Sequence, residues 1–337
     1  DKETRPNLFK MTMPGRGFVQ KLLREAVDRD CTHAVIEITS EGARQFRHEA
    51  LSLNALIFTN IAREHIESHG SYEKYKEAKL AIGRALLNSG KRPRIMVANP
   101  EDELGEVFLK LPVEKRLPFR LADAEPWTTS DEKVSMSVSG ATFDIAFPGT
   151  FTIMNALAAA VLARELDITP AVIARSLHLL DKIPGRVERV ERGQSFLVVV
   201  DYAHTSGSLA ALYGAFPGRR KICVLGNTGG GRDRWKRPEM GGVADETCDT
   251  VILTDEDPYD EDPRAIVDAM VGGMRRAPLI IMDRREAIRA ALEQAQAGDA
   301  VFVTGKGTDP YIMGPHGKKT PWSDAKVVVE ELDALMA

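Results

Sequence analysis

Residues 33–38 read HAVIEI and residues 55–59 read ALIFT, and both short apolar runs are typical of buried β-strands. Each run ends near a side chain that can hold a cation, because Glu37 lies on the first and His65 follows the second. Residues 72–79 then form a helical segment that brings lysines into the same neighbourhood. An open α/β sheet binds its ligands at the carboxyl ends of adjacent strands, so this stretch predicts a magnesium and phosphate site.

The individual side chains of this stretch also have plainer explanations. Taken alone, His65 is more typical of a structural histidine, and Lys79 of a solvated helix residue. Glu37 and His69 favour the ligand interpretation, because they add a carboxylate and a second imidazole to the same part of the sequence.

The composition is that of an ordinary globular protein. A chain of 337 residues suits about two domains, and an apolar content of 43% provides for a sizeable core. The formal charge of −4, from 45 basic and 49 acidic residues, gives no reason to expect nucleic acid as the main partner. No apolar run reaches the ~18 residues of a membrane span, so none is expected in this chain.

The chain contains three cysteines, Cys31, Cys223 and Cys248. They lie in or near strand-like runs and lack the spacing of metal ligands. We therefore predict buried free thiols in a reducing cytoplasm.

The first half of the chain mixes helical and strand-like segments. Residues 1–13 are polar and start without an initiator methionine or a signal peptide, so we expect the chain to begin within a longer protein. The patterns predict helices at 15–30, 72–87, 153–166 and up to 180, a strand at 94–98, and an antiparallel hairpin of residues 134–138 and 143–147 around Ser139-Gly140.

The second half is more regular. Pro184-Gly185 interrupts both periodicities, so residues 182–186 are predicted to be a domain boundary. Beyond it, helical stretches alternate with strand-like runs at 196–200, 222–225, 251–254, 279–282 and 300–304. This alternation predicts a mostly parallel sheet with helices on both faces.

Two loops that follow strands in this half carry groups suited to a nucleotide. In Asp201-Tyr-Ala-His204, the carboxylate can accept hydrogen bonds from a ribose and the imidazole can meet phosphate; the alternative is a helix N-cap beside a solvated histidine. Residues 226–233, GNTGGGRD, nearly fit the Walker pattern, but Arg232 and the next aspartate replace its Lys-[Ser/Thr]. Glycine-rich backbone can still bind an anion, so with Lys236 and Arg237 close by we favour a ligand loop over a plain turn.

Two further loops carry charges suited to an amino acid. Residues 255–262 are almost wholly acidic and are either a solvated loop or a site for the ammonium group of an amino acid. Gly305-Lys-Gly-Thr-Asp309 follows the last strand. Either Lys306 and backbone amides hold a carboxylate there, or the loop is a glycine turn with an exposed lysine.

Together these segments resemble the Mur ligases, and most closely the UDP-N-acetylmuramoyl-tripeptide synthetases among them, over nearly the whole chain. Glu37-Ile-Thr-Ser-Glu-Gly42 is similar to that family's E-V-S-S-H-G. Thr59-Asn60, Glu64-His65 and His69-Gly70 are similar to its T-N…D-H…H-G. The other motifs that fit are Tyr75-Lys-Glu-Ala-Lys79, Asn155 in N-x-L-A-A, Pro184-Gly-Arg186, Asp201-Tyr-Ala-His-Thr205, Lys236-Arg-Pro238, Asp257-Pro258 and Gly305-Lys-Gly307.

The resemblance implies an ATP-dependent ligase of peptidoglycan precursor synthesis, acting in the cytoplasm and contributing to cell shape and division. It joins an amino acid to a UDP-N-acetylmuramoyl peptide through an acyl phosphate. The implied catalytic residues and Mg²⁺ ligands are Glu37, His65 and a carbamylated Lys79. The implied ATP contacts are Asn155, Arg186, Asp201 and His204. The implied substrate contacts are Thr12, Ser40, Arg232, Lys236, Arg237, Glu256, Asp257, Gly305 and Asp309.

This chain departs from the family pattern in several places. It contains no Gly-Lys-Thr phosphate loop, and Thr12 already matches a point downstream of that loop. We therefore expect the first strand and phosphate loop of the ATPase domain to be missing, with the UDP-binding domain before them, and the chain alone to show no ATP-dependent ligation. Three further family residues are replaced: a histidine by Glu41, an asparagine by Thr152 and a proline by Ser206. The roles of these family residues are therefore not carried over to this chain.

The motif that the family uses for the amino acid also differs. Its D-N-P-R signature for meso-diaminopimelate becomes Glu256-Asp-Pro-Tyr259. Without the arginine, the second carboxylate of diaminopimelate loses a partner. Lysine or another amino acid is an equal alternative.

The expected architecture is α/β: an incomplete Mur ligase central ATPase-like domain over residues 1–181, lacking its phosphate loop, and a Rossmann-like carboxyl-terminal domain over residues 182–337. Two alternatives stay open. One is another amide ligase of this fold, of the folylpolyglutamate or cyanophycin synthetase type, against which the motifs at 201–205 and 305–307 argue. The other is a non-catalytic nucleotide- or partner-binding protein, which the missing phosphate loop favours.

Overall fold

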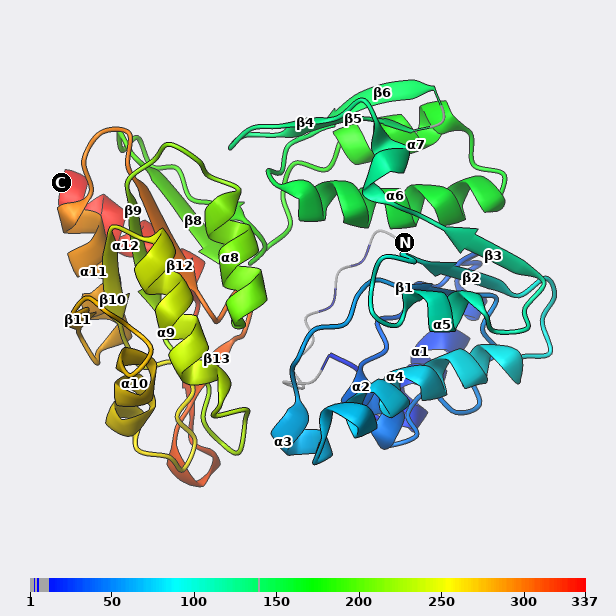
Figure 1. Cartoon of the computed structure of the whole chain (residues 1–337), viewed down its shortest axis with the longest axis horizontal. Coiled ribbons are helices and arrows are strands. Elements are labelled where there is room, and N and C mark those ends of the chain that lie inside the picture. The colour runs from blue at the N-terminus through cyan, green and yellow to red at the C-terminus, as the bar shows by residue number, and fades with distance from the viewer. Residues whose placement is uncertain (1–2, 4, 6–11, 139) are drawn as a thin grey trace. The chain divides into compact units, whose positions relative to one another are not determined.

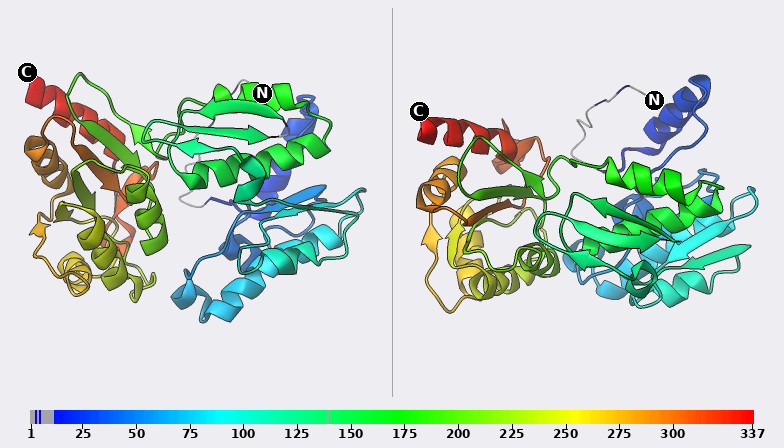
Figure 2. Two further views of the ribbon diagram at one scale, coloured as in Figure 1. Left: turned by 45° about the horizontal axis from the view of Figure 1, so that its top comes forward. Right: turned by 90° about the horizontal axis from the view of Figure 1, so that it is seen from above.

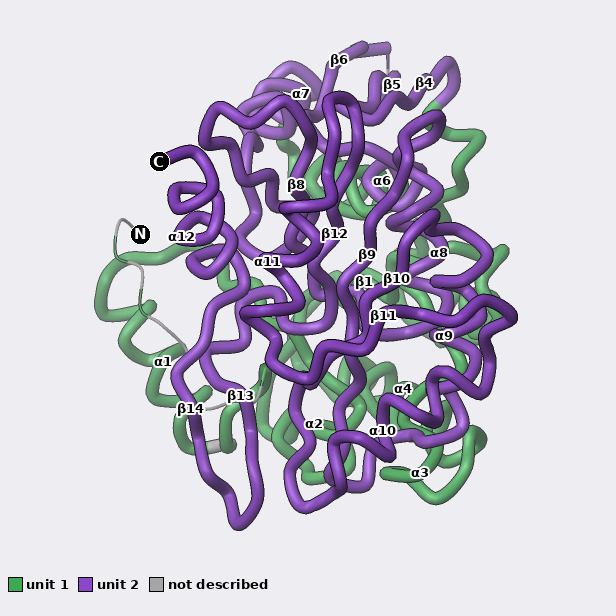
Figure 3. Tube along the Cα trace, turned by 90° about the vertical axis from the view of Figure 1, so that its left-hand side faces the viewer, with its two compact units in different colours: residues 1–124, 154–169 green, residues 125–153, 170–337 purple. Residues whose placement is uncertain are grey.

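The computed structural model describes residues 3, 5, 12–138 and 140–337. The chain divides into two compact units (Figure 1, Figure 3). Unit 1 comprises Asp1–Ala124 and Met154–Thr169, and unit 2 comprises Glu125–Ile153 and Pro170–Ala337. Helix α6 (Thr150–Glu165) begins in unit 2 and ends in unit 1. None of the described helices is long and apolar enough to cross a membrane.

Unit 1 is built on a parallel sheet with the strand order β1 (Ala55–Phe58), β2 (Ile95–Ala98), β3 (Lys115–Pro118). Its other helices are α1 (Arg16–Asp28), α2 (Ser40–Arg44), α3 (Ile66–His69), α4 (Tyr72–Leu87) and α5 (Gly105–Leu109), with a 3₁₀ turn at Leu121–Ala124. The buried side chains of Phe58, Leu86, Met96 and Phe108 join β1, β2, α4 and α5 in one core. The predicted strands at 55–59 and 94–98 and helices at 15–30 and 72–87 are confirmed.

Helix α4 forms where apolar residues recur on one face of a helix. Tyr75, Ala78, Ile82 and Leu86 are all buried at spacings of three or four residues. The hydroxyl of Ser71 caps the helix by accepting the Lys74 N–H at 3.1 Å. The same periodicity places Lys79 one turn after Tyr75, so the two side chains are neighbours.

The prediction of a buried strand at residues 33–38 is wrong. These residues form no strand, and Val35 is 99% exposed. A strand needs a neighbour that takes up its N–H and C=O groups, and among the described strands β1 pairs with β2 alone. Ile36 and Ile38 instead pack beside Met13 and the rest of a small core next to α1. Glu37 therefore lies on a loop and not at the end of a strand.

The large sheet of unit 2 has the order β11-β10-β9-β12-β8-β7. Its strands are β7 (Glu188–Arg189), β8 (Leu197–Asp201), β9 (Lys221–Leu225), β10 (Thr250–Leu253), β11 (Leu279–Ile280) and β12 (Ala300–Thr304), and only the β7–β8 pairing is antiparallel. Figure 2 shows α8 (Ser206–Gly214), α9 (Lys236–Thr247) and α10 (Pro263–Val271) on one face, and α11 (Arg284–Gln294) and α12 (Asp324–Met336) on the other. The predicted parallel sheet with helices on both faces is confirmed.

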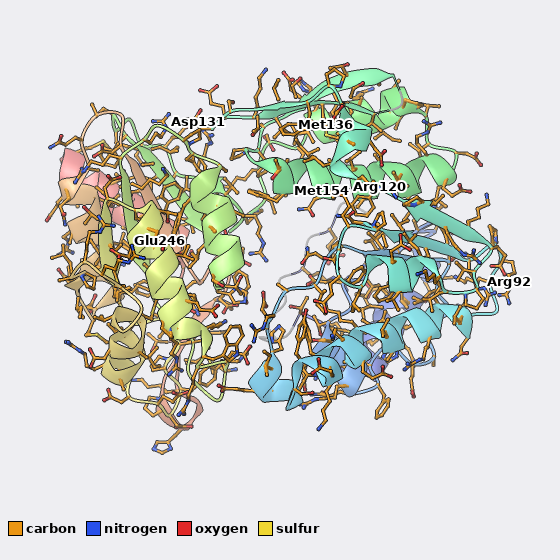
Figure 4. All side chains as sticks on the ribbon, in the orientation of Figure 1. Arg92, Arg120, Asp131, Met136, Met154 and Glu246 are labelled. Atoms are coloured by element: carbon orange, nitrogen blue, oxygen red, sulfur yellow. A yellow bond between two sulfur atoms is a disulfide. The ribbon has the colours of Figure 1, made fainter. Side chains whose placement is uncertain are left out.

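Unit 2 also contains two smaller β-structures. One is a sheet of β4 (Thr128–Thr129), β5 (Val134–Val138) and β6 (Ala141–Ile145), against which α7 (Pro170–His178) packs. The antiparallel β5–β6 hairpin was predicted, although Ser139 of its turn lies outside the described residues. Asp131, labelled in Figure 4, lies between β4 and β5 and pairs with Arg219, 2.6 Å between Oδ2 and the guanidinium. The other is the hairpin of β13 (Tyr311–Met313) and β14 (Lys319–Pro321), which a 3₁₀ turn at Pro315–Gly317 connects.

The prediction of three buried free thiols is wrong. Cys223 and Cys248 form a disulfide, and Cys31 is a partly exposed free thiol. Cys223 lies in β9 and Cys248 ends α9 just before β10, so the pairing of β9 with β10 brings the two sulfurs together. Sequence spacing does not show which strands are neighbours, and therefore it did not reveal this bond.

This bond predicts a specific thiol count. Protein denatured without reductant is expected to expose one reactive thiol per chain, and three after reduction. Titration with a chromogenic disulfide reagent measures both numbers, and the Cys31→Ser variant serves as the control, with none before reduction and two after it. Three thiols in the unreduced protein would contradict the disulfide.

Candidate functional site

The first candidate site lies in unit 1 around the buried ring of Tyr75 on α4. The ring centroids of His65 and His69 lie 5.5 Å and 5.4 Å from that of Tyr75, and 6.4 Å from each other. Lys79 Nζ lies 5.6 Å from the Tyr75 centroid. One tyrosine ring therefore contacts two imidazoles and an amine.

Lys79 is half-buried, and three carboxylates act on it. Burial lowers the pKa of its ammonium group, while the charges of Glu64, Glu37 and Asp102 raise it. Because burial prevails, Lys79 is neutral in a larger fraction of molecules than a lysine in water at the same pH. The neutral amine is the nucleophilic form.

The structure brings the three predicted catalytic residues into one neighbourhood of unit 1. His65 and Lys79 both contact Tyr75, and the charge of Glu37 acts on Lys79. His65 has a left-handed backbone with φ 57°, a conformation that side chains rarely adopt outside functional or tightly constrained positions. Across the part of the chain that the structure describes, no three His, Cys, Asp or Glu side chains form a metal site by themselves.

The other predicted residues of unit 1 are more scattered. Ser40 is buried at the start of α2, where the Thr39 hydroxyl accepts the Gly42 N–H at 3.0 Å. Thr12 and Asn155 are exposed, the latter on α6. None of these three positions has a described contact with the Tyr75 cluster.

The second candidate site lies in unit 2, at the carboxyl ends of β8, β9, β10 and β12. Asp201 ends β8 and is buried. Its Oδ2 accepts the Val187 N–H at 2.7 Å, and its Oδ1 accepts the Ala203 N–H at 2.6 Å. Burial raises the pKa of this carboxyl, and the two hydrogen bonds oppose the rise. Asp201 therefore holds the backbone at Val187 and at Ala203, in addition to any contact with a ligand.

Tyr202 follows Asp201 and is the neighbour of two predicted nucleotide contacts. The Arg186 guanidinium lies 4.5 Å from the Tyr202 ring centroid, and the His204 ring lies 4.8 Å from it. Lys236 Nζ donates to the His204 carbonyl at 3.0 Å, which ties the start of α9 to this loop. The structure therefore brings Arg186 and His204 together around one tyrosine, and Lys236 contacts the backbone of the same loop.

The electrostatics of Tyr202 show which other groups lie near it. Burial raises the pKa of Tyr202 to about 12, and the carboxylates of Asp309 and Glu256 contribute to the rise. The guanidinium groups of Arg186 and Arg232 oppose it. Predicted residues from four separate loops therefore act on a single phenol.

The glycine-rich loop after β9 has two amides that are already engaged within the protein, and the prediction that the loop binds a ligand stays a prediction. Gly229 N–H donates to the Asp257 carbonyl at 2.8 Å, and Gly231 N–H donates to Glu261 Oε1 at 3.4 Å. A Cβ on Gly229 would lie 2.3 Å from the Pro258 oxygen. Glycine is therefore required here because the loops after β9 and β10 approach closely.

The basic residues beside this loop differ in their surroundings. Arg237 is buried, and it donates to Asn227 Oδ1 at 3.2 Å and to Glu261 Oε2 at 3.1 Å. Lys236 is also buried, whereas Arg232 is exposed. Among Arg232, Lys236 and Arg237, the three basic residues predicted here as substrate contacts, Arg232 is the one whose side chain is exposed to solvent.

The acidic loop after β10 is not a plain solvated loop. Glu256 and Asp257 are each 2% exposed. Glu256 Oε1 accepts the Thr228 hydroxyl at 2.7 Å, whereas Oε2 is buried and has no hydrogen-bond partner among the described residues. Burial raises the pKa of this carboxyl. A Cβ on Gly305, whose φ is 106°, would lie 2.1 Å from Glu256 Oε2, so this glycine makes room for the carboxylate.

The prediction of an exposed lysine at position 306 is wrong. Its side chain is fully buried, and Nζ lies 2.8 Å from Asp257 Oδ2 and 3.3 Å from Asp309 Oδ2. Lys306 is therefore a buried lysine whose ammonium group is paired with two carboxylates of the protein, and the prediction that it holds a substrate carboxylate stays a prediction. The sequence did not reveal this because the loops after β10 and β12 meet only in the folded sheet.

Four residues that organise the two sites were not among the predicted site residues, namely Tyr75, Glu64, Asp102 and Tyr202, although all but Asp102 lie in motifs that the sequence shares with the family. Tyr75 was detectable, because it precedes Lys79 by one helical turn. Tyr202 follows the last residue of β8, and the sequence does not show that Arg186 and His204 pack against its ring. Asp102 carries no local signal, and the effect of Glu64 and Asp102 on Lys79 arises only in the fold.

Comparison with known proteins gives matches along nearly the whole chain. Residues 8–163 match the family model described as the Mur ligase middle domain, and residues 185–307 match the Mur ligase, glutamate ligase domain. The chain is 37% identical over 327 residues to the UDP-N-acetylmuramoyl-L-alanyl-D-glutamate–2,6-diaminopimelate ligase of Chlorobaculum tepidum, with 90% of this chain and 63% of that protein covered. It is 34% identical over 355 aligned positions to the UDP-N-acetylmuramyl-tripeptide synthetase of a Roseiflexus species, with 95% and 68% covered.

Solved structures agree with this result. A structure of a UDP-N-acetylmuramoyl-L-alanyl-D-glutamate–2,6-diaminopimelate ligase matches 98% of this chain and 71% of its own, at 28% identity and a TM-score of 0.61. A Mycobacterium tuberculosis folylpolyglutamate synthase shares the fold at 16% identity, with a TM-score of 0.61. The chain spans about two thirds of the length of the curated relatives it matches, from 63% to 68% for the two named above.

Proposed function

The chain belongs to the Mur ligase family, and from this premise we propose that it acts in an ATP-dependent amide ligase of peptidoglycan precursor synthesis. The proposed substrates are a UDP-N-acetylmuramoyl peptide and an amino acid, which the names of the relatives support. The proposed compartment is the cytoplasm. The proposed domain boundary is at residues 182–186, which span the end of the unmatched stretch 164–184 and the first two residues of the second matched model.

The proposed reaction has two steps. The terminal carboxylate of the UDP-sugar peptide attacks the γ-phosphorus of ATP, and ADP leaves with the electrons of the broken bond. The amine of the incoming amino acid then attacks the acyl carbon, phosphate leaves, and the nitrogen loses a proton. Catalysis of such transfers depends mainly on positioning and on neutralising the charge of the phosphates.

The observation that best supports this proposal is the environment of Lys79. A half-buried amine with a lowered pKa and three carboxylates around it is suited to react with CO₂ to form a carbamate. The carbamate adds the oxygen ligands that Mg²⁺ prefers to a set that otherwise contains the Glu37 carboxylate and the His65 imidazole. Glu37, His65 and Lys79 would then hold Mg²⁺, which supplies charge neutralisation for the triphosphate.

In unit 2, the proposed nucleotide contacts are Arg186, Asp201 and His204. Asn155, on the part of α6 that belongs to unit 1, is a further proposed contact. Arg186 stacks on Tyr202 and is exposed, so its guanidinium is available to a phosphate. The proposed amino-acid contacts are Arg232, Glu256, Gly305 and Asp309, which lie at the same edge of the large sheet. Thr12 and Ser40 are proposed for the UDP-sugar peptide.

A phosphate-release assay tests the proposal. The longest natural form of the protein is given ATP, Mg²⁺, a UDP-N-acetylmuramoyl dipeptide and an amino acid, and each component is omitted in turn. Phosphate release is expected to require all of them, with an amide product visible by mass spectrometry. ATP binding without phosphate release for any amino acid would instead support a non-catalytic nucleotide-binding protein.

We further propose that the amino acid has a single carboxylate and a cationic or neutral side-chain end. Tyr259 takes the place of the arginine in the family's diaminopimelate signature, and its ring packs on Gly230. In the same loop, the buried Glu256 Oε2 has no hydrogen-bond partner among the described residues and is suited to an ammonium group and not to a second carboxylate.

The Tyr259→Arg variant tests this assignment. It is expected to raise the ratio of kcat/KM for diaminopimelate to that for lysine by about 10- to 100-fold, the worth of one charge-assisted hydrogen bond. Tyr259→Phe is the matched control, since it keeps the ring and adds no charge. A wild-type protein that already prefers diaminopimelate would show this assignment to be wrong and leave the ligase function itself intact.

A further inference from the structure

Asp257 is a junction between three loops at the edge of the large sheet. Its Oδ2 lies 2.8 Å from Lys306 Nζ, and its Oδ1 accepts the Met313 N–H at 2.7 Å. Its main-chain carbonyl accepts the Gly229 N–H at 2.8 Å. Asp257 thus joins the glycine-rich loop, the loop after β12 and the β13–β14 hairpin.

The hairpin makes further backbone contacts with the acidic loop. The Met313 carbonyl accepts the Tyr259 N–H at 2.9 Å, so Met313 binds residues on both sides of Pro258. At the tip, His316 N–H donates to Asp260 Oδ1 at 2.7 Å. The hairpin therefore holds the backbone that carries Tyr259 and Asp260.

The charges at this junction are removed from water. Lys306 is fully buried and Asp257 is 2% exposed, and Asp309 is the second carboxylate in reach of the ammonium group. A buried ion pair is costly to break, because one partner is left charged without compensation. The geometry of the three loops therefore depends on this pair being intact.

We propose that Asp257 and Lys306 are a positioning pair, which holds the acidic loop in place so that Glu256 and Tyr259 face the amino-acid substrate. Both carboxylate oxygens of Asp257 are engaged within the protein, so Asp257 acts through its neighbours and not as a substrate ligand. The kinetic part of the test rests on the proposed ligase function, whereas the exchange part does not.

The Asp257→Asn variant separates the two contacts of this side chain. The amide oxygen can still accept the Met313 N–H, but the amide nitrogen faces the Lys306 ammonium group, donor against donor. Amide hydrogen exchange, measured by NMR, is expected to become about 10- to 100-fold faster at Tyr259 and Met313. This factor corresponds to the free energy of one lost charge-assisted hydrogen bond. In the ligase assay, KM for the amino acid is expected to rise about 10-fold or more, with kcat and KM for ATP within about threefold of wild type.

The matched control is Asp245→Asn. Asp245 is a nearly buried partner of the Arg276 guanidinium and the Arg275 N–H, and it has no described contact with the three loops. Its loss is expected to leave exchange at Tyr259 and Met313 and KM for the amino acid unchanged. If Asp257→Asn fails to fold, Lys306→Met provides the same test, and the double variant is expected to be less unstable than the sum of the two single variants.

Three results would overturn the proposal. One is wild-type exchange at Tyr259 and Met313 in Asp257→Asn, and another is equal acceleration in the Asp245→Asn control. The third is a raised KM without faster exchange, because it would make Asp257 a direct substrate ligand. A protein that shows the expected exchange but ligates no amino acid would contradict the proposed function alone.

Discussion

Replacing Lys79 by methionine is expected to lower ligase turnover by about 10²- to 10³-fold while the fold remains at least as stable as in the wild type. Turnover falls because methionine can form no carbamate and so removes one of the proposed Mg²⁺ ligands. The fold is retained because methionine matches the length of the lysine stem and packs beside Tyr75 on α4. Phosphate release and urea unfolding measure the two effects.

The direction of the stability effect follows from the pKa of Lys79. Burial lowers this pKa below that of lysine in the unfolded chain, so between the two values the unfolded chain binds more protons. Wild-type stability therefore includes a cost at neutral pH, which diminishes as the pH rises from the folded pKa towards 10.5. Lys79→Met removes this cost, and the difference in unfolding free energy between variant and wild type is expected to shrink as the pH rises.

The carbamate itself can be observed. Protein equilibrated with ¹³C-bicarbonate is expected to show one slowly exchanging carbamate resonance that Lys79→Met lacks. Lys76→Met is the control from the same helix, because Lys76 contacts Glu103 and Tyr72 and not the Tyr75 ring. Undiminished turnover in Lys79→Met, or a carbamate resonance that survives in it, would show that Lys79 does not have the proposed role.

The parts of this protein that could be predicted from sequence are those with local signals. The Tyr75–Lys79 spacing places both residues on one face of a helix, and the alternating strands and helices after residue 196 specify the parallel sheet. The surroundings of these elements have no local signal. Lys306 looks like an exposed lysine in a glycine turn until the loops after β10 and β12 meet, and HAVIEI looks like a strand until its lack of a neighbour is known.

The same reasoning applies to the glycine-rich loop. Its glycines suggested a cradle for an anion, but two of their N–H groups are used by the acidic loop. Glycine permits close approach of any partner, whether a phosphate or another loop, and sequence alone does not distinguish the two. The distinction requires the sheet order, because β9 and β10 are neighbours and their loops leave the same edge.

Replacing Asp324 by alanine is expected to lower the unfolding free energy of unit 2 by about 3–5 kcal/mol, the cost of breaking a buried ion pair. Asp324 and Arg284 are 0% and 1% exposed in their side chains, and they form two contacts of 2.8 Å. Trp322 Nε1 also donates to Asp324 at 2.7 Å. Alanine removes the carboxylate and leaves a buried guanidinium without a counter-charge. Urea unfolding followed by circular dichroism measures the loss.

The effect is expected to reach the candidate site, because Arg284 also donates to the carbonyls of Thr304, at 2.8 Å, and Asp255, at 3.4 Å. These residues directly precede Gly305 and Glu256. The control is Asp333→Ala, which breaks an exposed pair with Arg192 and is expected to change stability far less. Equal losses in the two variants would show that burial does not govern the cost.

A double variant identifies the origin of the cost. If the loss in Asp324→Ala comes from the orphaned charge of Arg284, replacing both residues by apolar ones of similar size, Arg284→Met with Asp324→Leu, should be less destabilising than Asp324→Ala alone. If the attraction between Arg284 and Asp324 itself stabilised the fold, the double variant would be less stable than Asp324→Ala. We expect the double variant to be the more stable, since the cost of removing two charges from water offsets most of the free energy of their attraction. The pair would then be required for the position of the Asp255 and Thr304 carbonyls, and the double variant should still impair amino-acid binding after its stability has recovered.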